Sequence, residues 1–454
     1  MRAIKRRGSS NPARIISESF AAVILIGALL LCLPVSSRSG TFTPFLDCLF
    51  TSASATCVTG LVLYDTYTYW SAFGQGVLIM LIQIGGLGLV TFTSFFNLVI
   101  GRKLGLRGMK LASESINSTS FGDVPNLLRM IITFTLTVES IGAVLLSFHF
   151  VPRFGMMGVA ISVFLAISAF CNAGFDILGF LGEYTSLTTF NDSYLVLFTI
   201  MMLIIVGGLG FIVWNDLLAY RRTKTLLLHT KIVLMVTAFL ILLGTFCFLL
   251  FEWDNPKTLQ PLSLKEKIGA GFMQSVTMRT AGFNSIDLYS MRDATKVFSI
   301  VLMFLGAAPG STGGGIKVTT IAVIIMTAVS IIRGKEEPCM MGRRLSAGVI
   351  YRSITILFFG IMVVGTTSVV LMTTCPLEAN GLSGIDAVFE AVSAFATVGV
   401  SSGVTAVSSQ ISKVVLILTM FIGRVGPVSF GLSLAAQKSV SRKLIVPEGK
   451  IIVG

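Results

Sequence analysis

Charged residues are scarce in this chain of 454 residues. Only 12% of them are Asp, Glu, Lys or Arg, against roughly 25% in soluble globular domains, whereas 54% are hydrophobic. The mean hydropathy is +0.88. This composition excludes an ordinary soluble domain and indicates a helical protein that crosses a membrane several times.

Histidine and cysteine offer little for chemistry. The two histidines, His149 and His229, are too few for a histidine-based metal or haem site. The seven cysteines are an odd number and lack metal-ligand spacing, so we interpret them as small hydrophobic residues. No nucleophile–base pair or phosphate site is evident. We therefore expect neither an enzyme nor a covalent cofactor.

Long apolar runs dominate the chain instead. Eight of them, each near the length of about 20 residues that a spanning helix needs, are expected to cross the membrane. They cover residues 15–33, 77–100, 127–150, 195–219, 232–251, 297–303 extended by 319–332, 350–372 and 414–436. The first run is too long for a cleavable signal peptide and lacks a convincing cleavage site, so we expect it to be the first span.

The formal net charge of +13 comes from 34 basic and 21 acidic residues. Basic residues cluster before the first run, in alternate connections and after the eighth run. Because cytoplasmic loops carry the excess of Lys and Arg, these connections and both termini are expected in the cytoplasm. The charge is spread over many loops, so membrane lipids, and no nucleic acid, are the expected surroundings.

One short pattern occurs four times. Its copies are SATCVTGL (54–61), SAFCNAGF (168–175), VTMRTAGF (276–283) and SAFATVGV (393–400). The central glycines, Gly60, Gly174, Gly282 and Gly399, are separated by 114, 108 and 117 residues, and a phenylalanine precedes each of them by ten residues. A near-constant period in a membrane protein predicts four repeats around a common axis.

Each repeat is expected to contain a span, a short apolar segment, a glycine loop and a second span. The short segment of the first repeat, 45–57, cannot cross a bilayer, so we expect a half-helix that enters and turns back. The predicted fold is an all-α integral membrane protein with eight transmembrane helices and four re-entrant half-helices around a pseudo-fourfold pore. The repeats are expected at 1–110, 111–225, 226–340 and 341–454.

Glycine loops that meet on one axis can bring backbone carbonyls together to replace the water around a potassium ion. Glycine has no Cβ, so it adopts the required angles and permits close approach. The candidate filter residues are Val58, Thr59, Gly60, Asn172, Ala173, Gly174, Thr280, Ala281, Gly282, Thr397, Val398 and Gly399. The hydroxyls of Thr56, Thr59, Thr280 and Thr397 are either ion ligands or structural hydrogen-bond partners, and both alternatives stay open.

The second span of the third repeat is interrupted by GAAPGSTGGGIK at 306–317. Proline and glycine do not hold a helix, so we expect a movable loop below the filter that acts as a gate. Its candidate residues are Gly306, Pro309, Gly310, Ser311, Thr312, Gly313, Gly314, Gly315 and Lys317. A phosphate-binding loop is disfavoured, because Val318 follows the lysine where such a loop needs Ser or Thr.

Arg424 lies within the last apolar run, where a charge is costly and suggests a function. Facing the pore, it is expected to repel cations and to hydrogen-bond carbonyls of loop 306–317, which makes it a gate residue. The alternative is a structural pairing with a carboxylate such as Glu139. The roles of Glu139 and Asp216 stay open.

At these motifs the chain resembles the Trk/Ktr/HKT superfamily of potassium transporters, most strongly the membrane subunit of bacterial Ktr potassium-uptake systems. The resemblance rests on the VTGL, NAGF, RTAGFN and TVG loops, on IQIGGLG, VGGLGF and STGGGIK, and on FIGRVGP, and it spans nearly the full length. It implies potassium uptake across the bacterial cytoplasmic membrane, with K⁺ held by the filter carbonyls and Na⁺ an open choice as coupling ion.

The resemblance also implies partners. These are a second copy in a homodimer, with the tail 447–454 at the interface, and a cytosolic ring of RCK-type nucleotide-binding regulatory subunits. Gly60 favours potassium, since plant relatives that pass sodium carry serine at that position. Pro309 departs from the glycine- and serine-rich run of many Ktr subunits. A sodium-translocating or sodium-coupled transporter is therefore the alternative, whereas a structural scaffold would leave the four glycine loops unexplained.

Overall fold

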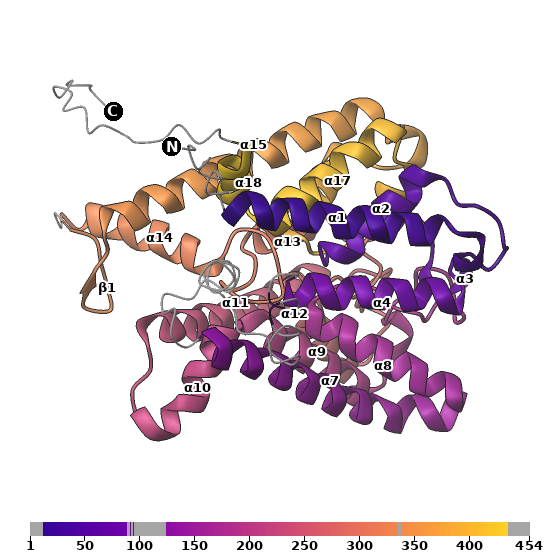
Figure 1. Cartoon of the computed structure of the whole chain (residues 1–454), viewed down its shortest axis with the longest axis horizontal. Helices are drawn as coiled ribbons and strands as arrows, with labels where there is room; N and C mark the ends of the chain where they lie inside the picture. The colour runs from indigo at the N-terminus through magenta and orange to yellow at the C-terminus, as the bar shows by residue number, and fades with distance from the viewer. Residues whose placement is uncertain (1–11, 89–90, 92–93, 95–123, 335–336, 435–454) are drawn as a thin grey trace, which may run out of the picture.

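The computed structural model describes residues 12–88, 91, 94, 124–334 and 337–434, and these are mostly helical (Figure 1). The helices are α1 Pro12–Cys32, α2 Phe45–Thr56, α3 Thr66–Tyr69, α4 Ala72–Leu87, α7 Val124–Phe154, α8 Met156–Cys171, α9 Tyr194–Leu209, α10 Phe211–Thr223, α11 Leu228–Glu252, α12 Leu264–Thr277, α13 Asp293–Phe304, α14 Val318–Ile332, α15 Ala347–Thr374, α16 Gly384–Ala396, α17 Gln410–Val425 and α18 Pro427–Leu434. The strands β1 Cys339–Met340 and β2 Arg343–Arg344 form an antiparallel hairpin.

Four helices of the described residues, α1, α7, α11 and α15, are each long and apolar enough to cross a membrane. They coincide with the predicted spans at 15–33, 127–150, 232–251 and 350–372. Their outward faces carry large apolar side chains, such as Phe239, 61% exposed, and Phe358, 60% exposed. Such faces suit contact with lipid tails.

Two of the other predicted spans, 195–219 and 414–436, are each broken at a glycine in the structure. Helix α9 ends at Leu209 and α10 departs from it at 92°. The glycine at the break, Gly210, has φ of 89°, and Gly426 between α17 and α18 has φ of 91°. Backbone in this region cannot continue an α-helix, and hydropathy does not detect it. In the run 77–100, α4 ends before Gly88, and most of the remainder lies outside the described residues.

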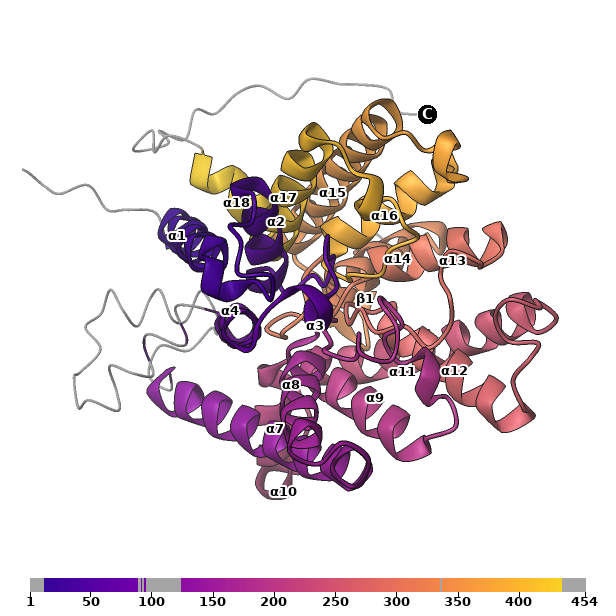
Figure 2. The ribbon, with the colours of Figure 1, turned by 90° about the vertical axis from the view of Figure 1, so that its right-hand side faces the viewer.

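Four short helices, α2, α8, α12 and α16, each lead to one of the repeated glycines. Helix α8 packs on α7 and α4, α12 on α11 and α9, α16 on α15 and α13, and α2 on α1 and α17. The packing therefore passes from group to group and returns from the end of the chain to its start. Figure 2 shows this circle, with α1, α2 and α4 on the left, α7 to α9 below, α11 to α13 on the right and α15 to α17 above.

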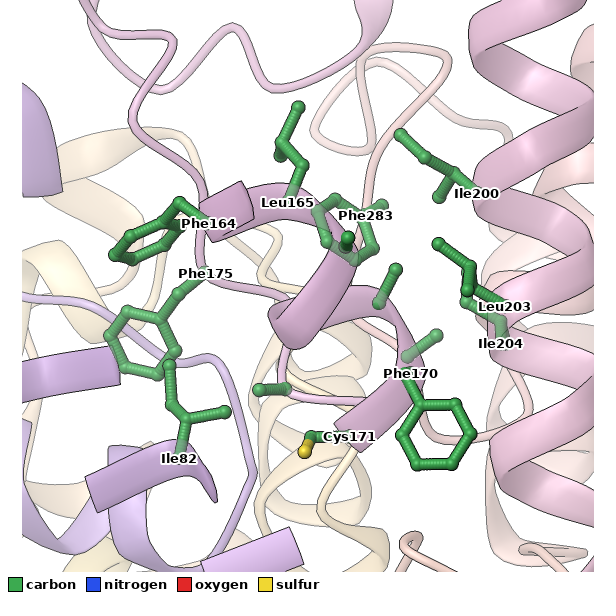
Figure 3. Packing of buried hydrophobic residues seen from close by; sticks show 14 of the residues in the cluster. Ile82, Phe164, Leu165, Phe170, Cys171, Phe175, Ile200, Leu203, Ile204 and Phe283 are labelled. Atoms are coloured by element: carbon green, nitrogen blue, oxygen red, sulfur yellow. The ribbon is translucent and has the colours of Figure 1, made fainter. Parts of the chain in front are cut away.

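The core around α8 illustrates how the groups meet. Phe170 and Cys171, both fully buried at the end of α8, lie between Ile82 of α4 and Ile204 of α9 (Figure 3). Lipid tails are as apolar as these side chains, so burial alone holds such helices together only weakly. Close packing and hydrogen bonds must supply the remaining stability of the helix contacts.

Glycines in the second helix of three groups give this close packing. A methyl group built on Gly85, Gly207 or Gly423 would lie closer than 3.0 Å to a backbone carbonyl oxygen. The oxygens belong to Thr56, Phe170 and Phe395, which each precede a repeated glycine by four residues. The helix glycines therefore fix the ends of the short helices at backbone contact distance.

We predict that Gly423→Ala lowers the free energy of unfolding by about 1–3 kcal/mol, because the added methyl group overpacks the α16–α17 contact. Gly365→Ala on α15 is the control, since nothing lies within 4 Å of its Cβ position. Denaturant midpoints in detergent micelles give both values. Equal midpoints for the two variants would contradict the packing argument.

Candidate functional site

The loops that follow the four short helices share one backbone conformation. The residue two positions before each glycine has a positive φ although it has a side chain: 57° at Val58, 60° at Asn172, 75° at Thr280 and 52° at Thr397. In three loops this residue lies within a Schellman-type cap, with Thr59 N, Ala173 N and Val398 N donating to the carbonyls of Ser54, Ser168 and Ser393. The cap ends the helix, and the residues that follow it run toward the centre of the circle of helices.

The four glycines meet there. Each has a positive φ, between 71° at Gly174 and 96° at Gly60. A methyl group on any one of them would lie closer than 3.0 Å to the carbonyl oxygen that precedes the glycine of the next repeat. In order, Gly60 meets Ala173 O, Gly174 meets Ala281 O, Gly282 meets Val398 O and Gly399 meets Thr59 O. The four contacts close a ring of backbone oxygens and glycines, and the structure thus brings all the predicted filter loops together.

A cavity of about 510 Å³ opens on one side of this ring and is lined by all four glycines. Four carboxylates in its wall are Asp65, Asp176, Glu183 and Asp287. Burial, together with the nearby Asp65 carboxylate, raises the pKa of Asp176 to about 6, while the Leu178 amide that donates to it acts in the opposite direction. The cavity offers a cation a negative approach to the ring.

Serine hydroxyls brace two of the loops, which the sequence analysis missed. The backbone N–H of Gly60 donates to Ser54 Oγ at 3.1 Å, and that of Gly399 donates to Ser393 Oγ at 3.1 Å. A serine also precedes Gly174 by six residues, but the third repeat has Val276 there. The serine six residues before three of the four glycines is the sequence pattern that could have predicted these hydrogen bonds.

The loop at 306–317 covers the opposite side of the ring. Thr312 Oγ1 donates to Phe170 O at 3.2 Å, and Gly314 N donates to Thr397 Oγ1 at 3.0 Å. A methyl group on Gly313 would strike Thr280 Oγ1. Thus Thr312, Gly313 and Gly314 reach the ends of three short helices, and Gly315 lies against Ala396.

The first half of the predicted gate run lies elsewhere. Gly310 O accepts the N–H of Phe211 at 2.9 Å, and Pro309 O faces Gly210, where α9 breaks. Ser311 Oγ donates to Ala308 O at 2.6 Å, and Gly306 lies against Gly314 O. These residues anchor the loop to α9 and α10, whereas Thr312–Gly315 face the ring.

Two cations hold the loop in place. Lys317 Nζ donates to Gly313 O at 2.6 Å and to Gly314 O at 3.3 Å. Arg424 donates from Nη1 to Thr312 O, and from Nη2 to the carbonyls of Gly85 and of Gly86, the latter at 3.1 Å. The guanidinium therefore links the loop to α4 of the first repeat. Within the described residues Arg424 forms no ion pair.

The structure shows which of the remaining polar candidate residues have hydrogen-bond partners and which do not. Thr280 Oγ1 and the Asn172 amide are hydrogen-bonded at 3.2 Å, and Thr397 Oγ1 accepts from Gly314, so both hydroxyls are structural partners. Among the described residues the hydroxyls of Thr56 and Thr59 have no partner. Glu139 accepts from Gln83 Nε2 at 3.2 Å, and Asp216 accepts from Leu227 N at 2.9 Å.

Two ion pairs support the short helices from outside the ring, and the sequence analysis missed them. Lys296 of α13 binds Asp386 of α16 at 2.7 Å, and Lys413 of α17 binds Asp47 of α2 at 2.6 Å. Each aspartate precedes its repeated glycine by 13 residues, and each lysine follows its own by 14 residues. The two pairs thus occupy equivalent positions between the third and fourth groups and between the fourth and first.

A membrane-helix ring of this kind, with backbone oxygens facing a negatively charged mouth, is the arrangement of a cation-conducting protein. The family model of the TrkH cation transport proteins matches residues 3–443. The chain belongs to this family.

Several curated proteins are similar over nearly their whole length. The Ktr system potassium uptake protein B of Bacillus subtilis is 38% identical over 98% of this chain and 97% of that protein. The potassium/sodium uptake protein NtpJ of Enterococcus hirae is also 38% identical, over the same shares. The crystal structure of the potassium transporter TrkH from Vibrio parahaemolyticus shares the fold, with a TM-score of 0.72 at 17% identity, over 96% of this chain and 87% of that one.

We predict that Asp386→Asn lowers the free energy of unfolding by about 3–5 kcal/mol, because it leaves the buried ammonium of Lys296 without its carboxylate. The side chains of this pair are only 7% and 4% exposed. The control is Glu18→Gln, which breaks the Arg14–Glu18 pair; its side chains are 65% and 62% exposed, so a change below about 1 kcal/mol is expected. Similar losses in the two variants, measured by denaturant unfolding, would refute the assignment.

Proposed function

We propose that the chain takes up potassium ions across the bacterial cytoplasmic membrane, through a selectivity filter made by the four glycine loops. The closed ring of Gly60, Gly174, Gly282 and Gly399 with its neighbouring carbonyl oxygens carries this proposal. Carbonyl oxygens held close together can replace the hydration shell of K⁺. The names of the relatives, potassium uptake protein B and NtpJ, agree with this cargo.

The architecture we propose is four repeats around a pseudo-fourfold pore, at 1–110, 111–225, 226–340 and 341–454. The cyclic packing of α2, α8, α12 and α16 supports it. Each of these helices points its C-terminal end at the ring, and the partial negative charge of a helix C-terminus favours a cation. The eight-span count depends on counting the interrupted second helices as spans.

A sodium-translocating or sodium-coupled transporter is the second candidate. The observation that favours it is the potassium/sodium label of the NtpJ relative, which is as similar to this chain as the Bacillus protein. The glycine at position 60 argues for potassium. Relative fluxes of the two ions decide between the two functions.

We propose that loop 306–317 is the gate and that Arg424 and Lys317 hold it closed. The loop lies against the ring on the side away from the cavity, and both cations bind its carbonyls. A positive charge beside the pathway also repels K⁺. Opening then requires the loop to leave the ends of α8, α12 and α16.

The cavity is proposed to face outward and the gate inward, with both termini in the cytoplasm. The cavity wall is acidic, while helix α10, which carries Arg221 and Arg222, and the β1–β2 hairpin, which carries Arg343 and Arg344, lie at the end opposite α3 (Figure 1). This agrees with an excess of positive charge inside. The Bacillus subtilis relative is named as part of a Ktr system, which supports a cytosolic RCK-type nucleotide-binding ring as partner. The homodimer is also proposed; its expected tail contact at 447–454 lies outside the described residues.

We predict that Gly60→Ser lowers the potassium-over-sodium permeability ratio at least about tenfold, an effect of about 1.4 kcal/mol. The side chain would strike Ala173 O and disturb the ring. The measurement is cation flux into liposomes with purified protein under an imposed voltage. Potassium-selective entry by the unchanged protein tests the proposed function itself.

The control for this prediction is Gly40→Ser. Gly40 has a similarly positive φ of 68°, but nothing lies within 4 Å of its Cβ position. It therefore carries the backbone strain without contact with the ring. A permeability ratio that is the same in both variants would remove Gly60 from the filter.

We predict that Arg424→Ala, and shortening of residues 306–315, raise basal flux at least about tenfold. One charge-assisted hydrogen bond contributes about 1.5–3 kcal/mol, and the arginine makes several to the loop and to α4. Arg352→Ala on the exposed face of α15 is the control. Folded variants that conduct like the unchanged protein would show that the loop is not the gate.

A further inference from the structure

One residue breaks the pattern at the ends of the short helices. The position three residues before each glycine holds Cys57, Cys171 and Ala396 in three repeats, but Arg279 in the third. All four side chains are buried, and Arg279 is only 8% exposed. The third loop is thus the one that carries a charge at this position.

The guanidinium of Arg279 lies behind the third loop, between α9 and α11. Its Nη2 donates a hydrogen bond to Thr237 Oγ1 at 3.3 Å, and its Nε has no partner among the described residues. It lines a cavity of about 10 Å³ together with Thr237, Gly208 and Ala307 at the base of the gate loop. That space suits a single water molecule.

This environment does not neutralise the charge. In the described part of the chain, Arg279 forms no ion pair with a carboxylate, unlike the buried lysines Lys296 and Lys413. Arginine keeps its charge in proteins. A buried charge without a counter-ion is costly and is rarely kept without a function.

The position of the charge suggests what it does. Arg279 lies directly after α12 and its cap residue Met278, and it directly precedes the filter residue Thr280. The C-terminal end of a helix attracts cations through its partial negative charge. A fixed positive charge at the end of α12 offsets that attraction in one of the four repeats.

We propose that Arg279 sets the affinity of the filter for the transported cation. Its fixed charge behind the third loop weakens cation binding, so that an ion held by the ring can leave toward the gate. Conduction needs binding that is strong enough for entry and weak enough for release. This inference rests on the proposed function. Arg279 does not contact the ion; its charge changes the electrostatic potential at the ring.

The test compares variants that remove or keep the charge. Arg279→Gln should lower the half-saturating K⁺ concentration about tenfold and also lower the maximal flux, since a more tightly held ion leaves more slowly. Arg279→Lys keeps the charge and should retain the half-saturating concentration of the unchanged protein. A purely structural brace would not separate the two variants in this way.

A second pair of variants leaves Arg279 in place. Thr237→Asp puts a carboxylate beside the guanidinium and should lower the half-saturating concentration as Arg279→Gln does. Thr237→Asn has nearly the same shape without the charge and should not. This pair decides the question if Arg279→Gln does not fold.

Potassium-dependent thermal stabilisation of the purified variants gives the same affinities without transport. Unchanged affinity in both charge-altering variants, or equal shifts in Thr237→Asp and Thr237→Asn, would overturn the inference. An unchanged protein that binds K⁺ but passes none into liposomes would count against the proposed function instead. The two failures are therefore distinguishable.

Discussion

The contact between four glycine loops is the constraint on which the rest of the structure depends. Backbone oxygens and glycine Cα atoms of neighbouring loops lie so close that any side chain at Gly60, Gly174, Gly282 or Gly399 would collide with the next loop. The loops reach this distance because each short helix ends in a residue of positive φ. Helix glycines such as Gly85 and Gly423 then lock the helix ends by backbone contact.

Non-helical backbone at membrane depth must find its hydrogen bonds within the protein. The loops here do so with serine hydroxyls, with cap bonds and with loop 306–317. Ala308 N donates to Gly208 O at 3.1 Å, and Gly315 N donates to Gly423 O at 3.3 Å. Loop 306–317 thereby satisfies carbonyls of the second helices while it covers the ring. Were this loop to open as proposed, these carbonyls would need water or other partners in place of the loop.

Much of this arrangement could be predicted from the sequence, because its signals are local. The short helix at 45–57, the ring glycines and the loop at 306–317 follow from spacing and composition, and the structure has elements at these places. The helix breaks at Gly210 and Gly426 could not be predicted, because hydropathy contains no information on backbone dihedral angles. The Lys413–Asp47 pair joins the two ends of the chain, and no local pattern reveals such a contact.

The third repeat differs from the other three in three features of its sequence. It carries loop 306–317 after the first part of its second span, it has Val276 in place of the serine that precedes the other glycines, and it has Arg279 in place of a small residue. Under the proposed function, loop 306–317 is the part that moves, and Arg279 is the charge that weakens cation binding at the ring. In this chain both departures belong to the same repeat, and Ala307 lines the cavity beside Arg279. If both proposals hold, the charge that weakens cation binding therefore lies beside the base of the loop that acts as the gate.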